Sequence, residues 1–164
     1  MKPFKKILVP IADFSAHANE VIETAADVSR RYEAPVTLLH VWEPEQPSAA
    51  DTQQLRDRSP GPRVLAEVAR LLDQACRDLR AAGVMEIDTQ QLQGAPAAEI
   101  VRMARAGGYD LIVLGTHRRT GVGSVAEHVL RTSPCAVLTA RLPEEHFDHP
   151  WEEPASRHRE PKGR

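Results

Sequence analysis

Long apolar runs are missing from this sequence, and none comes close to the roughly 18 residues that a membrane-spanning helix requires. The amino-terminal segment MKPFKKILVP turns polar again before the apolar centre of a signal peptide could form. We therefore expect no membrane partner and a cytoplasmic location.

Cysteine is scarce, because the 164 residues include only Cys76 and Cys135, which are far apart and form no CxxC pair. This usage suits a reducing compartment and argues against a disulfide framework and against a zinc site. His117 and His128 lack a third ligand at a suitable spacing, so no metal centre is predicted from them.

Clustered positive charge and the common phosphate-binding motifs are also absent. The net charge is -2 and the Lys and Arg residues are scattered, which leaves no basic face for nucleic acid. There is no Walker GK[ST] motif. The segment GVGSVA (121–126) fits G-x-G-x-x-A but does not follow the first strand, where a dinucleotide fingerprint belongs.

What the sequence does contain is a regular alternation of strand and helix patterns. Apolar runs predict strands at 5–11, 35–42, 85–92, 109–116 and 135–141. Helical periodicity predicts a helix after each of the first four strands, and Gly83 ends the second of these helices. This order predicts one domain, a three-layer α/β/α sandwich around a five-stranded, mainly parallel sheet, with 85–92 as a half-buried edge strand.

Two segments fall outside this alternation. Residues 43–62 are rich in Pro, Ser, Gln and charge and predict a long flexible loop. The carboxyl-terminal residues combine prolines with mixed charge, so we expect an α/β domain over 1–142 and a disordered tail over 143–164.

Ligands of open parallel sheets bind beyond the carboxyl ends of the strands, where the strand order reverses direction. In this sequence that rule selects three connections: PIADFS (10–15), VWEPE (41–45) and GTHRRTGVGS (115–124).

Four stretches together resemble the universal stress protein (UspA-like) family over about residues 3 to 141: KKILVPIADFS, LLHVWEP, AAEIVRMARAGGYDLIVLGTH and GSVAEHVLRTSPCAVLTAR. The resemblance implies strand order 3-2-1-4-5, a homodimer formed through residues 135–141, and a stress-response role. In one branch of the family it implies ATP bound by a G-x2-G-x9-G-[ST] loop, whereas another branch lacks that binding.

Matched to that loop, Gly115 takes the first glycine's place, Arg118 the second, and Gly123 with Ser124 the closing pair. Only residues 119–122 separate Arg118 from Gly123, so the loop is about five residues short of the nine that the pattern requires. PIAD also carries one residue more than the family pattern, which displaces Asp13. Val41 would present its backbone to adenine. The implied binding residues are Pro10, Asp13, Val41, Gly115, Arg118, Gly123, Ser124 and Val125.

Each candidate also has a purely structural interpretation. Val41 is also an ordinary core residue at a strand end, and Gly115, Gly121 and Gly123 are also plain turn glycines. Ser124 and Glu127 form an S-x-x-E capping box, whose helix start either attracts phosphate or only caps the helix. Asp13 either contacts a ribose hydroxyl, or Mg²⁺ when nucleotide is bound, or caps the first helix. Arg118 either grips phosphate oxygens or faces solvent.

Three functional classes remain: a nucleotide-binding switch, a dimeric interaction protein with a reduced site, and an enzyme of a related α/β fold. The sequence lacks an S-G-G-x-[DS] loop and a His/Cys/Ser catalytic set, so we predict that it is not an enzyme. We expect a homodimeric stress-response module that acts on an unknown protein partner and binds ATP weakly or not at all. The alternative is an ATP-binding switch.

Overall fold

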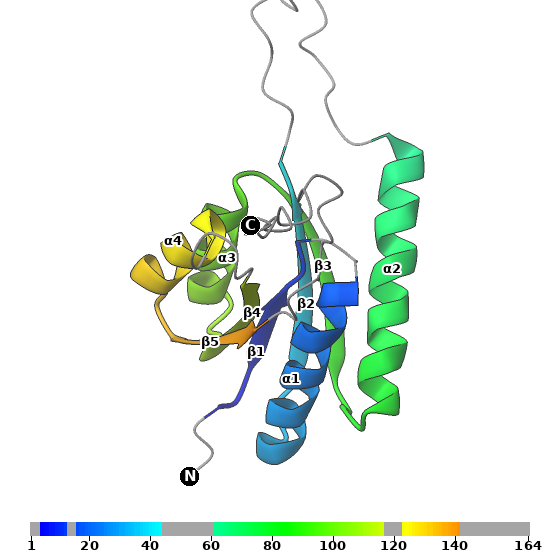
Figure 1. Cartoon of the computed structure of the whole chain (residues 1–164), viewed down its shortest axis with the longest axis vertical. Helices are drawn as coiled ribbons and strands as arrows, with labels where there is room; N and C mark the ends of the chain where they lie inside the picture. Colours follow the sequence, from blue (N-terminus) through cyan, green and yellow to red (C-terminus); the bar gives the residue numbers. More distant parts are fainter. Residues whose placement is uncertain (1–3, 13–15, 44–60, 117–122, 142–164) are drawn as a thin grey trace, which may run out of the picture.

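The computed structural model describes residues 4–12, 16–43, 61–116 and 123–141, which form strands and helices in alternation (Figure 1). The elements are β1 (Ile7–Pro10), α1 (Ala16–Tyr32), β2 (Val36–Trp42), α2 (Pro62–Ala81), β3 (Ile87–Gln93), α3 (Pro96–Ala106), β4 (Leu111–Thr116), α4 (Ser124–Thr132) and β5 (Ala136–Arg141). The predicted flexible loop, apart from its ends, and the predicted tail lie outside the described residues.

All five strands are parallel, in the order β3-β2-β1-β4-β5. Helices α1 and α2 cover one face of the sheet, and α3 and α4 cover the other (Figure 1). The three-layer fold predicted from the alternation of patterns is confirmed, and so is the strand order that the family resemblance implied. Strand β3 lies at an edge and alternates between half-buried and exposed residues, as its sequence predicted.

Two hydrophobic clusters, one on each face, hold the layers together. Side chains of successive strand residues point to opposite faces, so Ile7 and Val9 of β1 join α1 and α2 while Leu8 joins α3 and α4. Strands β1 and β4 are central and buried on both faces, which explains why their sequences are almost continuously apolar.

Helix α2 ends where the sequence predicted. Gly83 has φ +92°, a left-handed conformation that favours glycine, and the Val84 N–H donates to the Leu79 carbonyl at 3.0 Å. This arrangement satisfies a carbonyl that the last helical turn leaves free and turns the chain back toward β3.

At the amino end of the sheet, Tyr109 joins the turn after α3 to β2. Its hydroxyl donates to Thr37 Oγ1 at 2.9 Å, and both residues are buried. Lys6 Nζ lies 4.3 Å from the centre of the Tyr109 ring. These contacts connect elements that are far apart in the sequence.

We expect Tyr109→Phe to lower the free energy of unfolding by about 1 to 2 kcal/mol, because Thr37 loses its buried hydrogen-bond partner. Chemical denaturation measures the change. Tyr32→Phe is the matched control: the Tyr32 ring packs edge-on against Phe4 at 5.1 Å, and within the described residues its hydroxyl makes no hydrogen bond. The control should change stability by less than about 0.5 kcal/mol. Equal losses in both variants would contradict the role of the Tyr109–Thr37 hydrogen bond.

Candidate functional site

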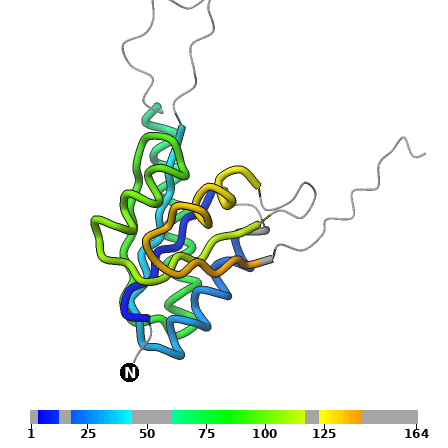
Figure 2. Tube along the Cα trace, turned by 90° about the vertical axis from the view of Figure 1, so that its left-hand side faces the viewer, coloured from blue at the N-terminus to red at the C-terminus, as the bar shows by residue number. Residues whose placement is uncertain are grey.

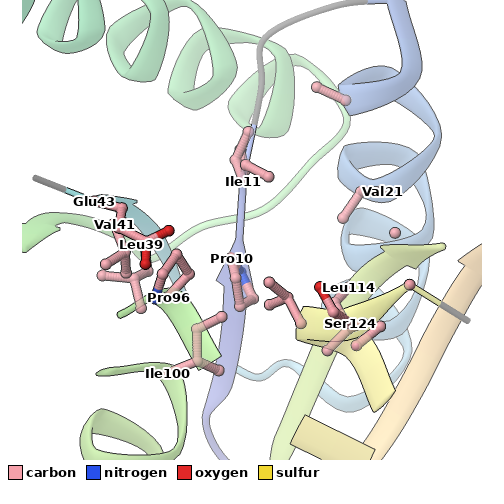
Figure 3. A pocket seen from close by; sticks show the side chains of 16 residues that line it. Pro10, Ile11, Val21, Leu39, Val41, Glu43, Pro96, Ile100, Leu114 and Ser124 are labelled. Atoms are coloured by element: carbon pink, nitrogen blue, oxygen red, sulfur yellow. The ribbon is translucent and has the colours of Figure 1, made fainter. Parts of the chain in front are cut away.

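A cavity of about 400 Å³ opens at the carboxyl ends of β1, β2 and β4. The chain runs from β1 to β2 on one side and later enters β4 on the other side of β1, so the cavity lies where the strand order reverses. Its volume is within the range of small-molecule sites. We call it the switch-point pocket; Figure 3 shows the residues that line it: Pro10, Ile11, Ala12, Ala18, Val21, Leu39, Val41, Glu43, Pro96, Ile100, Leu114, Gly115, Gly123, Ser124, Val125 and Ala126.

The end of β1 is shaped by Pro10 and by a histidine from β2. Pro10 has no N–H to donate and is the last residue of the strand, after which the Ile11 N–H donates to the Leu39 carbonyl at 2.8 Å. His40 Nδ1 donates to the Ile11 carbonyl at 2.9 Å and holds the exit of β1 against β2. Sequence reasoning missed His40, although a polar residue within the apolar run LLHVW was a visible signal.

Val41 and Gly115 lie on either side of β1 along the pocket. Val41 belongs to β2, pairs with Leu92 and packs at the border of the cluster beneath α3 and α4. Gly115 pairs with Ala140 as an ordinary residue of β4 and carries no side chain that would narrow the pocket. Both candidates from the sequence therefore line one cavity.

Helix α4 begins differently from the capping box that the sequence suggested. Gly123 is the residue before the helix, with φ +74°, and its carbonyl accepts the first helical hydrogen bond, from the Glu127 N–H at 2.9 Å. Ser124 is thus already the first helical residue, its side chain makes no capping hydrogen bond, and the Glu127 carboxylate pairs with Arg131. The predicted capping box is wrong, because glycine at positive φ supplies the turn that Ser124 was expected to make.

The start of α4 nevertheless borders the pocket through Gly123, Ser124 and Val125. A Cβ atom built on Gly123 would meet none of the described atoms within 4 Å, so its conformation, not crowding, requires glycine there. The free N–H groups and the positive end of the helix dipole at this point favour an anion. Asp13 and Arg118, the two remaining candidates, lie outside the described residues.

The pocket has opposite polarity at its two ends. Glu43, directly after β2, is the one charged side chain among the lining residues that the structure describes. Figure 3 shows Glu43 beside Val41 and Pro96, with Pro10 between it and Ser124. The rest of the wall is mostly apolar, which suits a flat, weakly polar group held between two polar ends. Sequence reasoning did not select Glu43.

The two cysteines, Cys76 and Cys135, are not activated nucleophiles. Burial raises the pKa of the Cys76 and Cys135 thiols, so both stay protonated and unreactive at neutral pH. Within the described ranges, no three His, Cys, Asp or Glu residues come together as a metal site, and no helix is long and apolar enough to cross a bilayer.

Residues 3–141 match the universal stress protein family. The universal stress protein MJ0531 of Methanocaldococcus jannaschii is 30% identical over 151 residues, which cover 85% of this chain and 84% of the relative. A universal stress protein from Archaeoglobus fulgidus in complex with dAMP has a TM-score of 0.66 at 24% identity, covering 85% of this chain and 98% of its own. A second universal stress protein, solved in complex with cAMP, has a TM-score of 0.67 at 21% identity, covering 85% of this chain and 98% of its own. The family match spans almost the whole fold and a relative of similar length agrees with it, so this chain belongs to the universal stress protein family.

Proposed function

We propose that this stress-response protein is a homodimeric binding module, not an enzyme, whose switch-point pocket takes an adenine nucleotide through its base, ribose and first phosphate. The observation that carries the proposal is the cavity of about 400 Å³ at the strand reversal, which borders the start of α4 at one end. Such a cavity suits an apolar ring system, and the helix start suits an anion attached to it.

The base would lie against the wall formed by Val41, Leu39 and Ile100, all of which line the pocket. The first phosphate would meet the N–H groups at Ser124 and Val125. Two proteins of the same fold were solved with cAMP and with dAMP, ligands that each carry a single phosphate. They support a nucleotide monophosphate as the ligand to test first.

Further phosphates would receive fewer contacts. The G-x2-G-x9-G-[ST] pattern is about five residues short here, and Arg118 replaces its second glycine. Fewer backbone N–H groups are then available to the outer phosphates, and Mg²⁺ would bind only together with a nucleotide that carries them. ATP binding is therefore proposed to be weak, with Arg118 and Arg119 as additional contacts to its phosphates. The alternative, an ATP switch, is tested by titration with ATP.

Calorimetric titration with AMP tests the pocket directly. We expect measurable binding that Val125→Trp weakens at least tenfold, since Val125 lines the pocket, is 39% exposed, and can be enlarged without disturbing the core. Val64→Trp on α2, where Val64 is 55% exposed, is the control and should leave the affinity unchanged. Absence of AMP binding at millimolar concentration, or equal effects of the two variants, would rule out this pocket as the nucleotide site.

The homodimer is proposed to form through β5. This strand pairs with β4 on one side (Figure 2) and is an edge strand of the described sheet. Within that sheet its other side therefore presents unpaired backbone N–H and C=O groups. Leu138, an apolar residue of β5, is 37% exposed. A second copy of the chain would cover both features.

Sedimentation at micromolar concentration should therefore show a dimer, and Leu138→Glu should convert it largely to monomer, because it places a charge in the apolar contact. Val64→Glu adds the same charge on α2 and should remain a dimer. A monomeric parent protein, or a dimer that Leu138→Glu leaves intact, would refute the β5 interface.

A further inference from the structure

We propose that the groove between α3 and α4 is an interaction surface, and that its occupant is the acidic segment 142–154 of this same chain. The groove is separate from the switch-point pocket, so the inference does not depend on nucleotide binding. The chemistry that the groove fits is a short peptide that combines carboxylates with aromatic rings.

The groove has an apolar floor and a basic rim. Helices α3 and α4 lie side by side over one face of the sheet (Figure 1), and a groove of about 550 Å³ lies between them. Val101, which is 9% exposed, forms its floor, and the short side chains of Ala98 and Ala106 leave room for a ring to approach. Arg105 and His128, both exposed, stand at the rim on facing helices. Such a surface suits a ligand that is apolar and anionic at once.

The positive groups at the rim are not neutralised by the helices that carry them. Each helix holds a single acidic residue, Glu99 in α3 and Glu127 in α4, and each carboxylate already pairs with an arginine of its own helix. The side chains of Arg105 and His128 make no hydrogen bond or ion pair with any of the described residues. A guanidinium and an imidazole therefore remain available to an incoming carboxylate.

The carboxyl-terminal part of the sequence carries the complementary chemistry. Residues 142–154 contain five Asp and Glu residues and no Lys or Arg, which gives this segment a charge of -5. The whole chain carries -2, so the rest of it carries +3 and attracts the segment. The segment also holds Phe147 and Trp151, two of the seven aromatic residues of the chain. Aromatic rings can cover the apolar floor and stack on a guanidinium.

The segment starts within reach of the groove. Strand β5 ends at Arg141, opposite the last residue of β4, at the end of the sheet where α4 begins beside the pocket. A helix rises about 1.5 Å per residue and an extended chain about 3.3 Å, so about four extended residues match the length of α4. Phe147 and Trp151, which are four positions apart, can thus occupy the two ends of the groove. A segment with no core of its own can still order on such a contact.

Trp151 provides a direct measurement of docking. The chain has two tryptophans, so Trp42→Phe leaves Trp151 as the only fluorescent indole in a full-length protein. Acrylamide should quench this fluorescence more slowly than it quenches a synthetic peptide of residues 142–154, because the groove covers the ring. Salt at about 1 M should reduce the difference, since it screens the contacts between carboxylates and the rim.

Substitutions at the rim separate the effect of charge from the effect of shape. Arg105→Glu with His128→Glu replaces attraction by repulsion and should lower the ratio of docked to free segment about tenfold. Arg105→Lys with His128→Lys places side chains of similar length but positive charge at the same positions and should keep Trp151 protected. Arg77→Glu with Arg80→Glu on α2 makes the chain more acidic on the opposite face of the sheet and should also preserve the protection.

Four results would overturn the proposal. Trp151 of the parent chain could be quenched as fast as the peptide, or the glutamate pairs on the groove and on α2 could have equal effects. Protection that disappears on dilution would assign the segment to the groove of a second copy. Should the glutamate pair at the rim prevent folding, protection of Trp151 that salt leaves unchanged would refute the contact with the basic rim.

Discussion

Titration with ATP is expected to give a dissociation constant in the millimolar range, roughly 10²- to 10³-fold weaker than an intact phosphate loop would give. A triphosphate needs several N–H groups that converge on its outer oxygens, and the segment between Gly115 and Gly123 is short of them. Losing two or three hydrogen bonds to charged oxygens, at about 1.5 kcal/mol each, accounts for the expected difference.

Lengthening the loop tests this explanation by gain of function. Arg118→Gly together with five additional residues before Gly123 restores the G-x2-G-x9-G-[ST] spacing. Calorimetry should then show ATP binding strengthened by about 10²-fold or more. The change for AMP should be much smaller, because its phosphate is proposed to bind at the start of α4 in both proteins.

Two further results test whether the short loop limits ATP binding. Replacing Arg118 and Arg119 by alanine without lengthening the loop should weaken residual ATP binding further, since a guanidinium makes strong bonds to phosphate. A low-micromolar ATP constant for the parent protein, unchanged by these substitutions, would show that the short loop still forms a complete phosphate site.

The sheet was predictable because the apolar pattern of each strand reflects how deeply that strand is buried. The central strands β1 and β4 are apolar almost throughout, and the edge strand β3 alternates, as their positions in the sheet require. Strand limits were less accurate: residues 5–11 were predicted for β1, whereas Ile7–Pro10 form it. Periodicity reports which residues are covered but not which strand is the neighbour, so the order came from the family resemblance.

The pocket was only partly predictable. Val41, Gly115 and Gly123 follow from the motif comparison and from the rule for strand ends, and all three line the cavity. Their roles in binding remain part of the proposal. His40 and Glu43 were missed because their positions depend on tertiary contacts, with the Ile11 carbonyl in one case and the turn after β3 in the other. The start of α4 was misjudged because sequence alone does not show that Gly123 has φ +74°.

A substitution at Leu39 can separate an effect on stability from an effect on binding, because the Leu39 side chain belongs both to the core and to the pocket wall. Leu39 and Leu8 are both fully buried in the cluster beneath α3 and α4, and of the two only Leu39 lines the pocket. Leu39→Ala and Leu8→Ala should each lower the free energy of unfolding by about 2 to 5 kcal/mol, since each leaves a cavity in a packed core. Denaturation midpoints should fall while the slope of the transition stays the same.

The two variants should differ in ligand binding, measured at a temperature and denaturant concentration where both are folded. Leu39→Ala widens the pocket and removes apolar contact with the base, so AMP affinity should fall about tenfold. Leu8→Ala removes the same atoms from the same cluster away from the pocket, so its AMP affinity should match that of the parent. If both variants lose affinity to the same extent, the loss reflects general destabilisation, and the base does not lie against Leu39.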